Sequence, residues 1–209
     1  MDPKPSGTDA ESVLQNQWEI QRRRKVWAIL VTWDIHTGIV LGRPTTIDLS
    51  LKPPTLPIDA PLPKDRSKTP VTVRENDTLP TPLTRCLWAY HVMAPLREVL
   101  DLEKEGPCPK DFSKVDQLHQ KLLDIDDRTP AFFRLDNPDT RYDNDPECYW
   151  LPMVRATLPQ LSSFNFIALH RPYIFTNPRS RIEALKASLK MLHAQRIHFQ
   201  SLRPPQYKT

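Results

Sequence analysis

The sequence is poor in glycine and rich in proline, and this balance excludes several classes of enzyme. Only 4 glycines occur among 209 residues, against 23 prolines. Enzymes that cradle phosphates in glycine-rich loops, and hydrolases with a nucleophile elbow, need glycines at fixed spacing. None of the patterns GxGxxG, GxxxxGKS/T or GxSxG is present. The sequence therefore gives no support to an enzyme of these classes.

Cysteine is also scarce, and its spacing argues against a structural metal site. The three cysteines are Cys86, Cys108 and Cys148. An odd number at wide spacing predicts reduced thiols in an intracellular protein. No CxxC pair occurs, and the 6 histidines form no HxxxH or HExxH pattern. We therefore expect solvated or hydrogen-bonded histidines, no metal site and no cofactor in this chain.

Long hydrophobic runs and a strong charge of either sign are missing. The longest apolar stretch, 26–41, contains Asp34 and His36 and is shorter than the ~20 residues that a membrane-spanning helix needs. Residues 1–17 lack the apolar segment of a signal peptide. A formal net charge of +4 is too small on its own to indicate nucleic-acid binding. We expect a soluble protein with no membrane contact.

Apolar residues recur at helical spacing, and no segment alternates as a β-strand does. Five helices are predicted, at residues 16–41, 81–103, 112–125, 150–171 and 180–200. A proline-rich connector, 43–80, separates the first two, and its spaced apolar residues predict that it lies on a surface. Pro95 predicts a kink or break in the second helix, and Pro159 an irregularity in the fourth. The predicted fold class is all-α, an irregular bundle of about five helices.

Local residues predict where several of these helices start and stop. Gly42 and Pro44 predict the end of the first helix, because glycine favours the left-handed stop and proline cannot continue the helix. Thr81 is the expected N-cap of the second helix. Ser180 is the expected N-cap of the last, with Glu183 completing a capping box.

Two helices have a distinctive distribution of apolar residues. The first is apolar around most of its circumference, which is typical of a helix buried in a core. Trp27, Trp33 and Trp88 are most simply core residues, and the alternative is an aromatic pocket between helices that binds a small molecule. The last helix has one apolar stripe, formed by Ile182, Leu185, Leu189 and Leu192.

Two stretches carry a resemblance to a known family. The first is RRRKVWAILVTWDIHTGIVLGRPTTID, and the second is LHRPYIF. Together they resemble the fungal-specific transcription factor domain, the middle homology region of fungal zinc-cluster regulators. The matching residues are Arg22, Arg23, Arg24, Trp27, Asp34, Gly42, Arg43, Pro44 and Asp48, then Leu169, His170, Arg171 and Pro172. The segment VDQLHQKLLDIDDRTP between them resembles the connecting helix of the family.

The resemblance covers about residues 18–205 and implies a function. It implies a regulatory, non-catalytic domain that acts in the nucleus on transcription by RNA polymerase II. Protein partners of the transcription machinery, a homodimer or a small-molecule effector are the partners that it implies. Ala28 stands where the family has a second large aromatic residue. The six-cysteine cluster with which the relatives bind zinc and contact DNA is absent, so DNA binding is expected only through a module outside this chain.

The expected domain organisation follows from the same family resemblance. Residues 1–15 are expected to form a flexible tail, and residues 16–205 a partial regulatory domain. The family domain continues with further helices, so the chain is expected to be a fragment or a truncated paralogue, with exposed apolar helix faces.

Two features have competing interpretations. The cluster Arg22–Lys25 is expected to form solvated helical turns, and the alternatives are a nuclear-import signal or a phosphate contact. Asp34 shares a helix face with apolar residues, so it needs a partner. Arg171 or Arg43 is the expected partner, and a catalytic acid is the alternative.

The function also has an alternative. The chain would be a truncated helical scaffold that binds proteins or ligands and has no DNA-binding activity of its own. An enzyme is a third hypothesis, and it would need a histidine and a carboxylate near a nucleophile.

Overall fold

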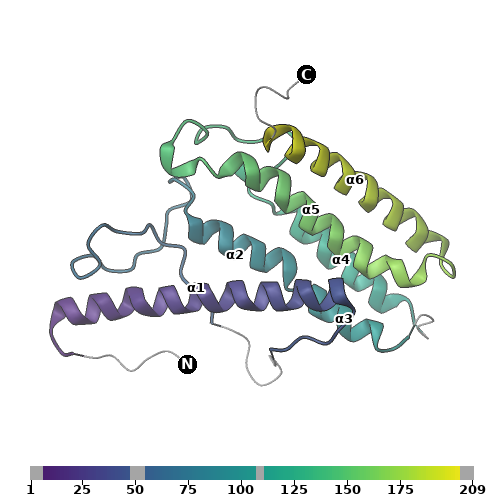
Figure 1. The fold of residues 1–209 in the computed structure, drawn as a ribbon, viewed down its shortest axis with the longest axis horizontal. Coiled ribbons are helices and arrows are strands. Elements are labelled where there is room, and N and C mark those ends of the chain that lie inside the picture. The colour runs from purple at the N-terminus through teal and green to yellow at the C-terminus, as the bar shows by residue number, and fades with distance from the viewer. Residues whose placement is uncertain (1–6, 48–54, 107–110, 203–209) are drawn as a thin grey trace. The chain divides into compact units, whose positions relative to one another are not determined.

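The computed structural model describes residues 7–47, 55–106 and 111–202, and the regular secondary structure within these ranges is all helical, with no β-strand (Figure 1). The predicted all-α class is confirmed. The α-helices are α1 (Ala10–Leu41), α2 (Pro82–Met93), α3 (Leu96–Glu103), α4 (Ser113–Asp127), α5 (Leu151–His170) and α6 (Pro178–Leu202). Three short 3₁₀-helices are η1 (Ala131–Phe133), η2 (Pro146–Cys148) and η3 (Arg171–Tyr173).

The chain divides into two compact units, Met1–Tyr90 and His91–Thr209. The first contains α1, the connector and most of α2. The second contains the last turn of α2 and the helices α3 to α6. The domain expected over residues 16–205 spans both units. No helix in the described ranges is long and apolar enough to cross a bilayer.

The two ends of α1 are set by local hydrogen bonds. The side chain of Asp9 accepts a hydrogen bond from the Ser12 N–H at 2.9 Å, as an N-cap does. The helix therefore begins at Ala10, and residues 10–15, which were expected to belong to a flexible tail, are helical. At the other end Gly42 adopts φ 62° and ψ 34°, which confirms the predicted glycine stop.

α1 buries one stripe of side chains rather than its whole circumference. The buried residues are Trp18, Gln21, Ala28, Val31, Ile35, Gly38 and Ile39. Trp27 and Trp33 are 41% and 63% exposed, so the expectation that they are core residues is wrong. Trp18 is the tryptophan of α1 that is buried, and its indole N–H donates to the Thr69 carbonyl at 2.7 Å. Exposed apolar side chains on α1 agree with the expectation of exposed apolar faces.

The proline-rich connector lies on α1 and on the start of α2, as its apolar residues predict. The N–H of Ile58 donates to the Gln21 side chain at 2.7 Å, and Ala60 is fully buried. The Asp59 carboxylate accepts hydrogen bonds from the hydroxyls of Thr81 and Thr84, at 3.0 and 2.9 Å.

Thr81 caps α2 as predicted. Its hydroxyl oxygen accepts from the Leu83 and Thr84 N–H groups at 3.1 and 3.2 Å. Pro95 separates α2 from α3, which confirms the predicted break, and Leu96 directly after it is fully buried.

α5 is the central helix of the second unit. It packs along α6 and also contacts α4 and α3, and Figure 1 shows it between α6 and α4. Its buried residues include polar ones, Ser162, Ser163 and Asn165. Pro159 lies inside α5, and the helix continues through it.

The start of α6 differs from expectation. The Asn177 side chain accepts the N–H groups of Arg179 and Ser180 at 2.9 and 3.2 Å, so Asn177 caps the helix and the predicted capping box of Ser180 and Glu183 is wrong. The face toward α5 carries small residues, and Ala187 is 6% exposed.

The segment between α4 and α5 is organised around one buried arginine. Arg155 of α5 is 7% exposed and forms two hydrogen bonds to the Asp143 carboxylate, at 2.5 and 2.6 Å. It also donates to the carbonyls of Phe132 and Asp139, at 2.9 and 2.8 Å. One guanidinium group thus binds three points of this loop.

Candidate functional site

Arg22 and Arg23 of the first signature are exposed on α1, whereas Arg24 is half-buried. Glu19 accepts two hydrogen bonds from Arg22, at 2.8 and 2.9 Å, and one from Arg23 at 3.0 Å. These hydrogen bonds lower the pKa of Glu19 to about 2. The side chains of Arg22 and Arg23 are 63% and 56% exposed. This geometry fits solvated helical turns in which the Glu19 carboxylate, one turn earlier, forms ion pairs with the two arginines.

Asp34 binds backbone groups rather than an arginine. Its two carboxylate oxygens accept the N–H groups of Thr46 at 3.0 Å and Ile47 at 2.8 Å. Burial acts to raise the pKa of Asp34, but these hydrogen bonds outweigh it, so the pKa lies below its ordinary value. Arg43 adds only a smaller charge effect and donates instead to the Thr46 hydroxyl at 3.2 Å. The expected ion pair is therefore replaced by a carboxylate that holds the chain after the helix.

The Gly-Arg-Pro residues make the turn that brings this segment back. The Arg43 N–H donates to the Gly38 carbonyl at 2.9 Å, one turn inside α1. A Cβ atom on Gly38 would lie 3.1 Å from the Arg43 carbonyl oxygen, so a larger residue would push the returning chain away. Pro44 is exposed. Asp48, the last signature residue of this stretch, lies outside the described residues.

His170 of the second signature is the centre of a buried polar chain. Its Nε2 lies 2.8 Å from Nδ1 of His119 on α4, and its Nδ1 lies 3.1 Å from the Ser180 hydroxyl on α6. His170 and Ser180 are each 2% exposed, and His119 is 6% exposed. Neither ring nitrogen of His170 is directed at a backbone carbonyl at the end of its own helix. His170 instead ties α5 to both of its neighbours.

Burial controls the protonation of both rings. It lowers the pKa of His170 to about 4, and the neighbouring His119 adds to the effect. Burial also lowers the pKa of His119. One proton lies between the two ring nitrogens, so both rings cannot be charged at once without losing this hydrogen bond.

The serine and the two histidines resemble part of a catalytic triad, but their surroundings do not suit catalysis. A nucleophilic serine must reach its substrate, and the Ser180 side chain is buried. The third member is the neutral ring of His119 rather than a carboxylate. The arrangement is better suited to orienting three helices than to attacking a substrate.

The remaining residues of the second signature differ in exposure. Leu169 is 1% exposed. The Arg171 side chain is 64% exposed, with its guanidinium 3.9 Å from Glu103. Pro172 is half-buried in η3. Only Leu169 and His170 of this signature are therefore buried core residues.

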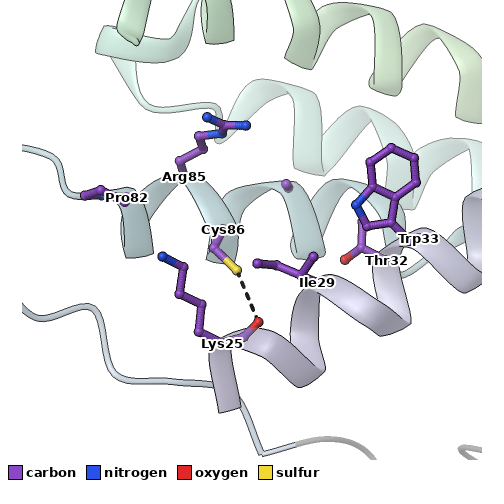
Figure 2. A pocket seen from close by; sticks show the side chains of 8 residues that line it. Lys25, Ile29, Thr32, Trp33, Pro82, Arg85 and Cys86 are labelled. Carbon is purple, nitrogen blue, oxygen red and sulfur yellow. Dashed lines mark hydrogen bonds between the residues drawn. The ribbon is translucent and has the colours of Figure 1, made fainter. Parts of the chain in front are cut away.

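A pocket of about 330 Å³ lies between α1 and α2 within the first unit (Figure 2). Figure 2 shows Lys25 and Arg85 toward the Pro82 end, and Trp33 at the other end. The lining residues are Lys25, Ile29, Thr32, Trp33, Pro82, Arg85, Cys86 and Ala89. The signature tryptophan Trp27 is not among them.

The pocket combines two cations with an apolar wall. No acidic side chain is among the described residues that line it, so Lys25 and Arg85 have no carboxylate beside them there. Burial raises the pKa of the Cys86 thiol, which keeps it protonated, and its sulfur lies 4.0 Å from the Lys25 carbonyl oxygen. This lining suits a small organic anion whose apolar part contacts Ile29 and Trp33.

Within the described residues, no group of three or more histidine, cysteine, aspartate or glutamate side chains could hold a metal ion. Sequence reasoning missed the contact of His119 with His170, because their helices are joined by a loop and no local pattern marks the pair. It also missed Arg155, whose position as the one charge in an apolar helix was a usable signal.

Comparison of the chain with protein-family models, with curated proteins and with solved structures finds no match.

Proposed function

We propose that this chain is a regulatory, non-catalytic domain of a fungal-specific transcription factor, acting in the nucleus on transcription by RNA polymerase II. The observation that carries the proposal is the role of the signature residues. Asp34 and Gly42 organise the end of α1, and His170 joins α4, α5 and α6. Residues that specify a helical framework are what a regulatory domain needs, whereas an enzyme needs accessible reactive groups.

The pocket between α1 and α2 is the binding site that we propose for a small-molecule effector. Its size and its mixture of cationic and apolar residues fit a small organic anion. Binding there would bear on α1 and α2 together, because both helices contribute to the lining. Contact with DNA would require a separate module with the six-cysteine zinc cluster. Protein partners of the transcription machinery would act on the exposed helix faces.

The exposed apolar side chains favour a second candidate function. Ile182, Leu185 and Leu189 are 53%, 60% and 59% exposed. A scaffold that binds proteins through such a face needs no DNA-binding activity. The alternative function is therefore a helical interaction scaffold.

Fusion to a heterologous DNA-binding module separates the two. The whole chain is fused to the module, and transcription is measured from a reporter that carries the module's binding site. The regulatory function predicts output that differs from that of the module alone. A matched fusion with Asp34→Ala and His170→Asn should lose the difference, because both signature contacts are removed. Unchanged output from a folded, nuclear fusion would favour the scaffold.

A further inference from the structure

α6 presents its large aliphatic side chains to solvent and its small ones to the fold. The solvent-facing residues, which we name the leucine face, are Ile182, Leu185, Leu189 and Leu192, and they are 53%, 60%, 59% and 60% exposed. On the opposite side Ser180, Ala187 and Ala194 are 2%, 6% and 0% exposed. The small residues allow α5 to approach closely, as Figure 1 shows for the two adjacent helices.

The spacing of the leucine face matches that of a coiled-coil seam. Its residues follow one another by three, four and three positions, which is the alternation of a and d positions in a heptad repeat. Polar residues occupy the flanks, among them Ser188 and His193. The apolar stripe is therefore two positions wide per heptad. A helix that lies in a membrane surface needs a wider apolar face, so this narrow seam favours another helix as its partner.

The charges around the leucine face are positive. Helix α6 contains five lysine and arginine residues and one acidic residue, Glu183. Glu183 is paired with Lys186 at 2.8 Å. Arg181 and Lys186 border the face, and Arg196 continues its line one turn beyond Leu192. Arg181 and Lys186 occupy the flanking g and e positions that set partner choice in a coiled coil, whereas Arg196 occupies the next a position of the seam itself.

This charge pattern disfavours a second copy of the chain as the occupant. Two α6 helices paired along their leucine faces would bring Arg181 and Lys186 of one copy near the same basic residues of the other. Like charges at such positions destabilise a helix pair, whereas carboxylates opposite them stabilise it. The complementary partner therefore carries glutamate or aspartate beside its own apolar stripe.

We propose that the leucine face of α6 docks an acidic amphipathic helix of another protein. The apolar stripe of that helix covers Ile182 to Leu192, and its flanking carboxylates lie opposite Arg181 and Lys186. The proposal rests on the exposure, spacing and charge of α6 and is independent of the transcriptional role.

The test uses the full chain and two synthetic helical peptides of about three heptads. Both peptides have leucine at the a and d positions. One has glutamate at the e and g positions, and the other has lysine there. Fluorescence anisotropy should show the glutamate peptide binding at least about tenfold more tightly than the lysine peptide. This preference should shrink as salt is raised, because salt screens exposed charges.

Two sets of variants separate apolar from charge contributions. Leu185→Ser with Leu189→Ser should weaken binding of the glutamate peptide about tenfold or more. The melting temperature of this protein variant should change little, because the side chains of Leu185 and Leu189 are both exposed. Val73→Ser, at a residue 71% exposed in the other unit, is the matched control and should leave binding unchanged. Reversing Arg181 and Lys186 to glutamate should invert the preference, so that the lysine peptide binds more tightly.

Several results would overturn the proposal. Equal binding of both peptides, binding of neither, or no inversion in the charge-reversal variant would each do so. Sedimentation that shows a dimer lost in the Leu185→Ser, Leu189→Ser variant would assign the face to a second copy. Binding to phosphatidylserine vesicles that exceeds binding to the glutamate peptide, and that is lost in the same variant, would assign it to a membrane surface.

Discussion

The Asp34 carboxylate accepts the Ile47 N–H at 2.8 Å, and so joins a helical turn of α1 to the chain that has already left the helix. The same carboxylate accepts the Thr46 N–H at 3.0 Å. A side chain thus supplies acceptors to two backbone donors that have no partner in a helix or sheet. The spacing between Asp34 and the Gly-Arg-Pro turn therefore has a physical reason. It places the carboxylate within hydrogen-bond reach of the chain that returns after the turn.

Replacing Asp34 by alanine should destabilise the first unit. The partly buried Ile47 N–H and the exposed Thr46 N–H lose their acceptors, at a cost of about 1–3 kcal/mol in the free energy of unfolding. Asp34→Asn keeps one acceptor oxygen and should cost less. Urea denaturation of both variants tests this order. Asp101→Ala is the control, because the Asp101 side chain is exposed and forms a surface ion pair with Lys104. Equal stability of Asp34→Ala and the parent chain would contradict this role.

The stability of the second unit should depend on the protonation of His170. Burial holds the pKa of His170 at about 4, below the ordinary 6.5, so between these values the unfolded chain binds a proton that the folded chain excludes. The free energy of unfolding is therefore highest above about pH 6.5. It falls toward about pH 4, by at most about 1.4 kcal/mol per pH unit for one histidine.

Other charges face this histidine and set the background of the measurement. His119 and Asp116 lie on α4, and Glu183 and Arg179 lie on α6, where Lys186 acts on His119. Denaturation of the parent chain and of His170→Asn between pH 4.5 and pH 7.5 isolates the effect of His170. The variant should be less stable at neutral pH and should show a flatter pH dependence. His193→Asn, at an exposed position, should keep the parent slope. A parent-like slope in His170→Asn would contradict the assignment.

Arg155 should be among the least replaceable residues of the second unit. Its removal leaves the Asp143 carboxylate and two carbonyls without their donor, and breaking such a buried pair costs about 3–5 kcal/mol. Arg155→Lys keeps the charge but cannot form all of these contacts, so it should recover only part of the loss. Thermal unfolding compares Arg155→Met, Arg155→Lys and the exposed control Arg134→Met. A loss of stability in Arg155→Met no larger than that in Arg134→Met would contradict this role.

Local signals in the sequence were sufficient for the helix ends that depend on a few neighbouring residues. Gly42, Thr81 and Pro95 act through their own backbone preferences and adjacent hydrogen bonds, so their effects could be predicted without knowledge of packing. The Ser180 cap failed for a long-range reason. His170 binds the Ser180 hydroxyl, and Asn177 takes over the cap.

The packing of α6 could not be predicted from periodicity. The helix has two faces that can exclude water, one of leucines and one of alanines. Periodicity identifies the leucine stripe but does not say which face approaches α5. A small-residue face permits a close approach of two helices, and its selection depends on the shape of the partner. Trp33 on α1 shows the same limit, because its hydrophobicity did not determine its burial.

The pocket between α1 and α2 should bind an amphipathic anion through Lys25 and Arg85. Octanoate is a suitable probe, because its carboxylate can lie near the two cations while its chain contacts Ile29 and Trp33. Isothermal titration should show binding to the full chain that weakens as salt is raised, because charge contributes to it. Lys25→Gln with Arg85→Gln should weaken binding about tenfold.

Three comparisons make this prediction specific to the pocket. Lys104→Gln with Arg134→Gln removes two exposed cations of the other unit and should leave octanoate binding unchanged. Trp33→Ala should weaken binding by removing apolar contact while both charges remain. Octanol, which has the same chain without the carboxylate, should bind less well than octanoate. Equal binding of octanol and octanoate would contradict the prediction, because the carboxylate would then make no contribution. No effect of the Lys25 and Arg85 substitutions would also contradict it, because the two cations of this pocket would then play no part.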